Sequence, residues 1–130
     1  MATLPPAGAA LADRAILAAF TTLHPSGAPH TTPVWVARDG NELLVNTAAG
    51  RVKARNVEHD PRVSVCLVDP DDPMNVLAVE GTVIEVTTEG ADALIDRLSL
   101  KYTGNATFGA RPPGQVRLTL RIRCDRVLLP

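Results

Sequence analysis

Apolar and polar residues alternate with a period of two near the C-terminal end of the chain, from residue 115 to residue 124. Successive side chains of a β-strand point to opposite faces of its sheet, so this alternation predicts a strand with one buried face. One face holds Val116, Leu118, Leu120, Ile122 and Cys124, and the other holds Arg117, Thr119, Arg121 and Arg123. Apolar runs of strand length also occupy residues 42–47, 62–68 and 76–87, the last with a predicted bend near Gly81.

Two further strands are predicted in the first third of the chain. Residues 14–23 are compatible with a helix, because they are rich in alanine, or with a strand, because they end in Phe-Thr-Thr-Leu. We assign a strand to residues 16–24, since Pro25-Ser26-Gly27 is typical of a hairpin turn. The next strand, 30–37, contains Pro33, which indicates an edge strand or a bulge. Asp39-Gly40 then predicts a two-residue hairpin.

Helical periodicity is clearest between Thr88 and Gly104. Thr88 is a candidate N-cap with Glu89 in the first turn, and Gly104 is a candidate residue for ending the helix. The predicted apolar face consists of Ala91, Leu94, Ile95, Leu98 and Tyr102. A shorter helix is predicted from Pro5-Pro6 to about Asp13.

These patterns amount to about six strands, several joined by short hairpins, and one helix of about four turns with smaller helical pieces. Strands of this length and spacing favour a closed or partly closed antiparallel barrel. We therefore expect a mainly β protein, one β-barrel domain over residues 1–130 with a helix packed on it.

Composition narrows the possible functions. A net charge of −1 argues against bulk attraction to nucleic acid, and an aromatic content of 3% argues against a base-stacking surface. No apolar run approaches the length of about 20 residues that a membrane span needs, and no signal-peptide pattern is present. Cys66 and Cys124 lie in apolar strands, where reduced buried thiols are the default. We expect a soluble cytoplasmic protein.

The segment from Asn46 to Pro61 carries most of the functional information. An apolar run leads into Gly50, after which Arg51, Lys53 and Arg55 alternate with small or apolar residues. We expect a strand feeding a short helix that ends before Pro61. Helix N-termini attract anions, whereas cations there oppose the helix dipole. The cations are explained either by a bound phosphate or, more simply, by a solvated helix face.

Other chemistry is sparse. There is no Gly-x-Ser-x-Gly elbow, and His24, His30 and His59 lack a second ligand at metal-binding spacing. We expect no metal site and no catalytic side chain. The arginine face of residues 117–123 favours an exposed barrel wall, although it adds cations for an anionic ligand. Any catalysis would depend on an organic cofactor. From its residues alone, we expect a barrel that binds a phosphorylated ligand, with a solvated helix face as the simpler alternative for the cations.

Six short segments, each weak alone, occur together in a familiar order and spacing between about residue 14 and residue 127. They are Thr22-Leu23-His24-Pro25-Ser26-Gly27, Thr32-Pro33-Val34-Trp35-Val36, Asn46-Thr47, Gly50-Arg51-Val52-Lys53-Ala54-Arg55-Asn56, Asp60-Pro61-Arg62-Val63-Ser64 and Lys101-Tyr102-Thr103-Gly104. In these the chain resembles the pyridoxamine 5′-phosphate oxidase-like, FMN-binding split β-barrel superfamily. Within it, the resemblance is to the B-type flavin/deazaflavin oxidoreductases. The resemblance implies a six-stranded split antiparallel β-barrel with a few short helices.

It also implies a homodimer with the cofactor at the subunit interface. By position, Gly50, Arg51 and Lys53 would hold the phosphate, supported by Arg55 and Asn56. The ring system would face Thr32, Pro33, Val34 and Trp35, with Asn46 and Thr47 on its other side. The implied activity is hydride transfer between the reduced deazaflavin coenzyme F420 and an electron-poor conjugated small molecule. The alternatives are an FMN-dependent oxidase or reductase, or a non-enzymatic cofactor- or tetrapyrrole-binding protein.

Overall fold

The computed structural model describes residues 2–109 and 111–128, in which three helices and seven strands are present. In chain order these are α1 (Pro6–Asp13), β1 (Ala18–Leu23), β2 (Pro29–Val34), β3 (Val36–Asp39), β4 (Glu42–Ala48), α2 (Val52–His59), β5 (Arg62–Asp69), β6 (Asp72–Thr87), α3 (Ala91–Thr103) and β7 (Arg117–Leu128). None of these helices is long and apolar enough to cross a membrane.

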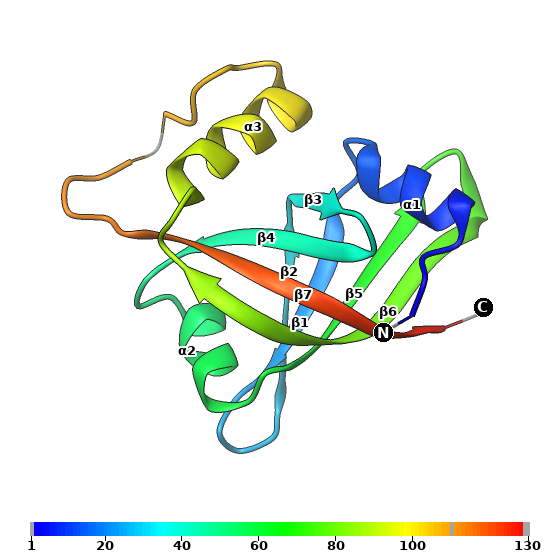
Figure 1. The fold of residues 1–130 in the computed structure, drawn as a ribbon, viewed down its shortest axis with the longest axis horizontal. Coiled ribbons are helices and arrows are strands. Elements are labelled where there is room, and N and C mark those ends of the chain that lie inside the picture. The colour runs from blue at the N-terminus through cyan, green and yellow to red at the C-terminus, as the bar shows by residue number, and fades with distance from the viewer. Residues whose placement is uncertain (1, 110, 129–130) are drawn as a thin grey trace.

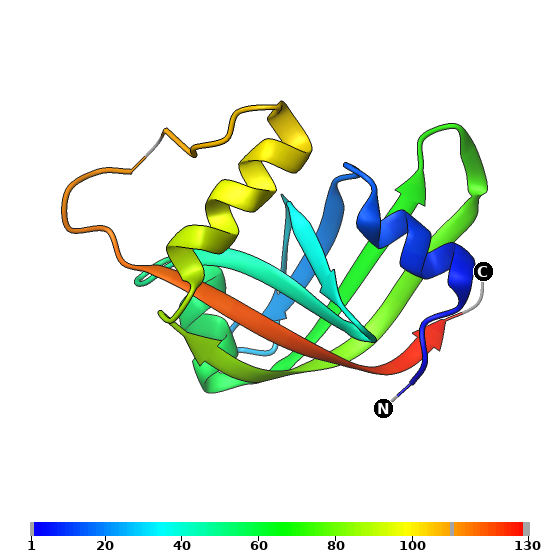
Figure 2. The same ribbon diagram turned by 45° about the horizontal axis from the view of Figure 1, so that its top comes forward.

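The strands form one antiparallel sheet in the order β2-β1-β5-β6-β7-β4-β3, which curls into a split barrel (Figures 1 and 2). The 16-residue strand β6 pairs with both β5 and β7, and its register against β7 shifts between Glu80 and Gly81. A Cβ atom on Gly81 would lie 2.6 Å from the carbonyl oxygen of Arg123, so only glycine fits without a shift. The structure thus has a register shift, typical of a β-bulge, at the position of the predicted bend.

The main core lies inside the curl of the sheet. Its largest fully buried side chains include those of Phe20, Leu43, Leu67, Leu77 and Ile122. The three helices cover different parts of the sheet: α1 packs on β5 and β6, α2 on β1 and β4, and α3 on β4 and β7 (Figure 1). A second apolar cluster forms under α3, where Leu44, Leu94 and Leu98 are buried and Trp35 and Tyr102 pack against them.

The structure has seven strands where the sequence predicts six, because the predicted strand 30–37 is interrupted at Trp35. Strand β2 ends at Val34 and pairs with β1, and β3 begins at Val36 and pairs with β4. The two halves therefore lie at opposite edges of the sheet. The expectation of an edge strand around Pro33 is confirmed for β2.

Two local predictions about turns and caps are wrong. Helix α3 begins at Ala91 after Gly90, whose φ of +73° places it in the left-handed region, and Thr88 does not cap it. In the β3–β4 hairpin Asp39 pairs with Glu42, so the two turn residues are Gly40 and Asn41 and not Asp39-Gly40.

The predicted apolar face of α3 is otherwise confirmed, with Ala91, Leu94, Ile95 and Leu98 buried and Tyr102 half-buried. Both cysteines are free thiols, Cys124 buried and Cys66 half-buried.

Candidate functional site

A groove of about 310 Å³ lies where the β2–β3 break, β4, α2 and α3 meet. Seven of the eleven predicted cofactor residues line it: Pro33, Val34, Trp35, Asn46, Thr47, Arg51 and Lys53. Five lining residues were not among those predicted, namely Leu17, Ile95, Leu98, Phe108 and Arg117. The structure thus brings together segments that are separated by up to about 100 residues of chain, as expected of a ligand site built on a β scaffold.

Four predicted residues do not line the groove. Gly50 lies in the turn before α2 with a φ of +87°, and Arg55 is exposed one turn further along the helix. Asn56 is buried and donates from Nδ2 to the hydroxyl of Thr22 at 3.0 Å, so its side chain ties α2 to β1. Thr32 is half-buried, and its hydroxyl has no hydrogen-bond partner among the described residues. Their assignment to cofactor binding stays a prediction.

The start of α2 is built from local sequence. β4 ends at Ala48, Gly50 allows the chain to turn, and the N–H of Arg51 donates to the carbonyl oxygen of Ala48 at 3.2 Å. Arg51 is the N-cap of α2, but no side chain caps the helix and no acid occurs in its first turn. The first N–H groups of α2 therefore remain available next to Arg51 and Lys53, which is the arrangement that binds anions.

Three cations meet at the groove: Arg51, Lys53 and Arg117. Within residues 2–109 and 111–128, no carboxylate lies at ion-pair distance from any of them. Burial lowers the pKa of Lys53, and the positive charges of Arg51 and Arg117 lower it further. Burial likewise lowers the pKa of Arg117, with Arg51 and Arg111 adding to the effect and Asp92 opposing it. An anion in the groove would relieve this repulsion.

Arg117 is the main residue whose position the sequence did not indicate. Its expected place was an exposed barrel wall, but it is only 7% exposed. It stands opposite Ala48 in the β4–β7 pairing, donates from Nε to Oδ1 of Asn46 at 2.8 Å, and donates from Nη1 to Oε1 of Gln115 at 3.3 Å. Leu118, Leu120, Ile122 and Cys124 are buried as predicted, whereas Val116 is exposed. Arg117 and Thr119 are buried as well, because α3 and the loop after it cover their face.

Aromatic side chains form one wall of the groove. The ring of Trp35 stacks on Tyr102 with centroids 5.4 Å apart and planes inclined by 12°. Phe108 meets Trp35 edge-on at 5.8 Å, and Cζ of Arg117 lies 5.5 Å from the Phe108 centroid. Phe108 is held there by α3, since its N–H donates to Oδ1 of Asp96 at 2.9 Å. A flat ligand with an anionic group fits this combination of rings and cations.

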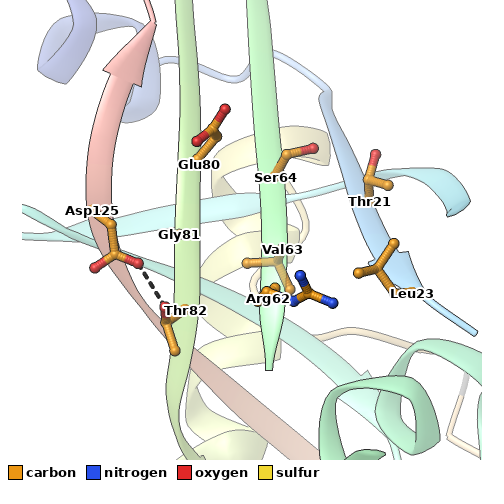
Figure 3. A pocket seen from close by; sticks show the side chains of 9 residues that line it. All are labelled: Thr21, Leu23, Arg62, Val63, Ser64, Glu80, Gly81, Thr82 and Asp125. Atoms are coloured by element: carbon orange, nitrogen blue, oxygen red, sulfur yellow. Dashed lines mark hydrogen bonds between the residues drawn. The ribbon is translucent and has the colours of Figure 1, made fainter. Parts of the chain in front are cut away.

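A larger hollow of about 490 Å³ lies elsewhere on the sheet, over β1, β5, β6 and β7 (Figure 3). Two of its three charged residues are in ion pairs among the described residues: Arg62 pairs with Asp60 at 2.7 Å, and Asp125 pairs with Arg123 at 2.6 Å. Its lining mixes hydroxyl groups with one cation and two carboxylates, and it lacks the cluster of cations found in the smaller groove. We therefore place the functional site in the smaller groove.

Comparison with known proteins agrees with this architecture. The model of the pyridoxamine 5′-phosphate oxidase family matches residues 4–128, so the chain belongs to that family. No curated protein matches the chain.

Solved structures show the same fold. A structure described as an F420 reductase is 26% identical in sequence and superposes with a TM-score of 0.84. The match covers 96% of this chain and 98% of the F420 reductase chain. The conserved hypothetical protein Rv2991 from Mycobacterium tuberculosis is 27% identical over 95% of this chain and 82% of its own, with a TM-score of 0.72. HupZ from Group A Streptococcus shares the fold alone, with 19% identity and a TM-score of 0.66. The match covers 95% of this chain and 91% of the HupZ chain.

Proposed function

We propose that this protein is an oxidoreductase that binds the deazaflavin coenzyme F420 in the groove and transfers hydride between it and an electron-poor conjugated small molecule. The observation that carries the proposal is the set of three uncompensated cations, Arg51, Lys53 and Arg117, beside the Trp35 wall. The likeness to a structure described as an F420 reductase supports the choice of coenzyme.

The groove residues fit such a coenzyme. Arg51, Lys53 and the free N–H groups at the start of α2 would hold its phosphate, with Gly50 providing the turn that presents them. The hydroxyl of Thr47 is buried at the groove without a hydrogen-bond partner among the described residues, so it is free to bind a polar atom of the ring system. Pro33, Val34 and Trp35 would lie against the ring itself.

Bound F420 would supply the hydride chemistry, and the protein would supply orientation, exclusion of water and electrostatics. Among the described residues that line the groove there is no Asp, Glu, His or Cys. Leu98 and Phe108 would provide apolar cover against water beside a bound ring. Arg117, held by Asn46, places a fixed positive charge there, which favours anionic forms of a bound ring or acceptor.

We further propose that two copies of the chain pair to complete the site. Ligand pockets usually occupy about 300–1,000 Å³, and the groove of about 310 Å³ is small for a tricyclic ring with a phosphorylated side chain. Leu17 at the groove is 58% exposed, which leaves an apolar surface for a second subunit to cover. A monomeric mass by light scattering, with coenzyme tightly bound, would refute this pairing. The free thiols agree with a reducing compartment, and we expect the protein to act in the cytoplasm.

Membership of the pyridoxamine 5′-phosphate oxidase family favours one second candidate, an FMN-dependent oxidase or reductase that uses the same groove. The phosphate site and the aromatic wall serve either coenzyme, because both combine a flat ring system with a phosphate.

A side-by-side titration with F420 and FMN tests the proposal. We expect F420 to quench the fluorescence of Trp35, the only tryptophan, with saturation at one coenzyme per subunit. Lys53→Ala should shift this curve to higher coenzyme concentration without changing its end point, while Arg97→Ala, on the exposed face of α3, should leave it unchanged. Reduced F420 should then be oxidised by conjugated acceptors. Tight binding of FMN alone would favour the second candidate, and binding of F420 without hydride transfer to any acceptor would contradict enzymatic function.

A further inference from the structure

The break between β2 and β3 leaves main-chain polar groups at Val36 facing away from the neighbouring strand. Two consecutive residues of α3 bind both of them. The N–H of Val36 donates to the hydroxyl of Tyr102 at 3.1 Å, and Nζ of Lys101 donates to the carbonyl oxygen of Val36 at 2.7 Å. Because β3 is an edge strand, these groups have no strand partner on that side, and side chains of α3 bind them instead.

The same two side chains also reach the N-terminal part of the chain. The Tyr102 hydroxyl donates to the carbonyl oxygen of Ile16 at 2.7 Å, and Nζ of Lys101 donates to the carbonyl oxygen of Ala12 at 2.7 Å. Lys101 and Tyr102 therefore join three segments: the end of α1, the approach to β1, and the β2–β3 break.

The surroundings of Lys101 are unfavourable for its positive charge. No carboxylate lies at ion-pair distance from its ammonium group within the described part of the chain, and the nearby Asp13 is bound by Arg38 at 2.6 Å. Burial lowers the pKa of Lys101, with Asp13 opposing the shift. The half-buried ammonium group is stabilised by hydrogen bonds to two carbonyl groups and by the charge of Asp13. These two bonds fix the end of α3 against Ala12 and Val36.

These contacts determine the position of Trp35, the residue at the break. The Tyr102 hydroxyl is bound at two points, which holds the outer end of its ring in place, and Trp35 stacks on that ring. Nζ of Lys101 lies over the face of the same ring, 5.1 Å from its centroid, in a cation–π contact. Trp35 lines the groove, whereas Lys101 and Tyr102 do not.

We propose that Lys101 and Tyr102 are positioning residues that hold Trp35 in the plane against which the coenzyme ring binds. The role of the pair in catalysis rests on the proposed function, but the positioning of Trp35 by the pair does not. The proposed role of the pair concerns one side chain, that of Trp35, at the break in the sheet.

Tyr102→Phe and Lys101→Met test the proposal, with Thr103→Val as the matched control. Thr103 also makes a side-chain hydrogen bond on α3, to the carbonyl oxygen of Ser99 at 2.7 Å, but it does not touch the break. In coenzyme-free protein we expect both test variants to lower the fluorescence anisotropy of Trp35 and to raise its quenching by acrylamide, with the control unchanged. With F420 bound, we expect the single-turnover hydride-transfer rate to fall by roughly 10²-fold, the loss that a misplacement of about 1 Å can cause, while affinity changes little.

Trp35 anisotropy and quenching equal to those of Thr103→Val would overturn the proposal. If Lys101→Met does not fold, Tyr102→Phe decides the question, because it keeps the ring and removes only the hydroxyl. If no variant or wild-type protein transfers hydride, the proposed function fails while the measurements on free protein still decide the positioning of Trp35.

Discussion

Nε of Arg117 donates a hydrogen bond of 2.8 Å to Oδ1 of Asn46, across the pairing of β7 with β4. The other end of the same amide is also occupied, since Nδ2 of Asn46 donates to the carbonyl oxygen of Ala91 at 2.8 Å. Asn46 therefore fixes the guanidinium of Arg117 at the groove without neutralising it. A carboxylate at this position would have nearly the same shape and the opposite electrostatic effect.

Asn46→Asp should weaken binding of a phosphate-bearing coenzyme by about tenfold or more, equivalent to about 1.4 kcal/mol, because the new charge compensates Arg117. Asn105→Asp makes the same charge change on an exposed loop and is the control, with little expected effect. Isothermal titration of both variants measures the difference. Equal affinities would show that the charge of Arg117 is irrelevant to binding.

Lys53→Ala should weaken coenzyme binding by about 1.5–3 kcal/mol, the range for a hydrogen bond to a charged group, with little change in fold. Burial lowers the pKa of Lys53 in the free protein, and a bound anion should raise it. The complex then holds the Lys53 proton more tightly, so affinity is full below the free-protein pKa of Lys53 and is lost as pH rises from that pKa through the higher pKa of the complex. Binding measured from about pH 7 to about pH 10 should show this alkaline loss, and Lys53→Arg should remove it. An identical pH profile for Lys53→Arg would assign the loss to another group.

Asn56→Ala should lower the free energy of unfolding by about 1–3 kcal/mol, because it leaves the fully buried hydroxyl of Thr22 without its partner. Adding Thr22→Val should cost less than the sum of the single changes, since the unpaired hydroxyl is then gone. Urea denaturation of the three variants gives the coupling. Unchanged stability with weaker coenzyme binding would instead place Asn56 in the binding site.

Gly81→Ala should destabilise the fold by about 1–3 kcal/mol, the usual cost of overpacking, because its Cβ would meet the carbonyl oxygen of Arg123 at 2.6 Å and Cγ2 of Ile122 at 2.8 Å. Gly109→Ala is the control, since nothing lies within 4 Å of a Cβ there. Thermal unfolding followed by circular dichroism compares the two. Equal melting temperatures would mean that β6 and β7 separate easily at the register shift.

Cys124 should resist alkylation in the native protein. Burial raises the pKa of its thiol to about 11, with the charges of Asp125 and Glu42 adding to the effect, so the reactive thiolate is scarce near neutral pH. A colorimetric thiol assay should count no more than one reactive cysteine, the half-buried Cys66, until urea exposes the second. Rapid reaction of both thiols in native protein would contradict the buried position of Cys124.

Several features of the fold could be predicted from sequence because their causes are local. The buried face of α3 follows from a helical period that Leu94, Ile95 and Leu98 obey. The register shift of β6 follows from Gly81, and the end of α2 before Pro61 follows from the restricted backbone of a residue that precedes proline. The concentration of cations at Arg51 and Lys53 was likewise visible in one short segment, and both residues line the groove.

The sequence by itself thus determined the periodic elements, the turn before α2 and the pair of cations that it presents. Only the tertiary structure decided that Arg117 joins that pair, that Phe108 packs on Arg117, and that Asn56 turns inward to Thr22. The first two outcomes depend on the pairing of β4 with β7 and on the packing of α3 across them, and the third depends on the packing of α2 on β1. All of these are contacts between segments far apart in the chain. A strand's own alternation shows which residues share a face, but whether that face meets solvent or a helix is set by the free energy of burying distant surfaces together.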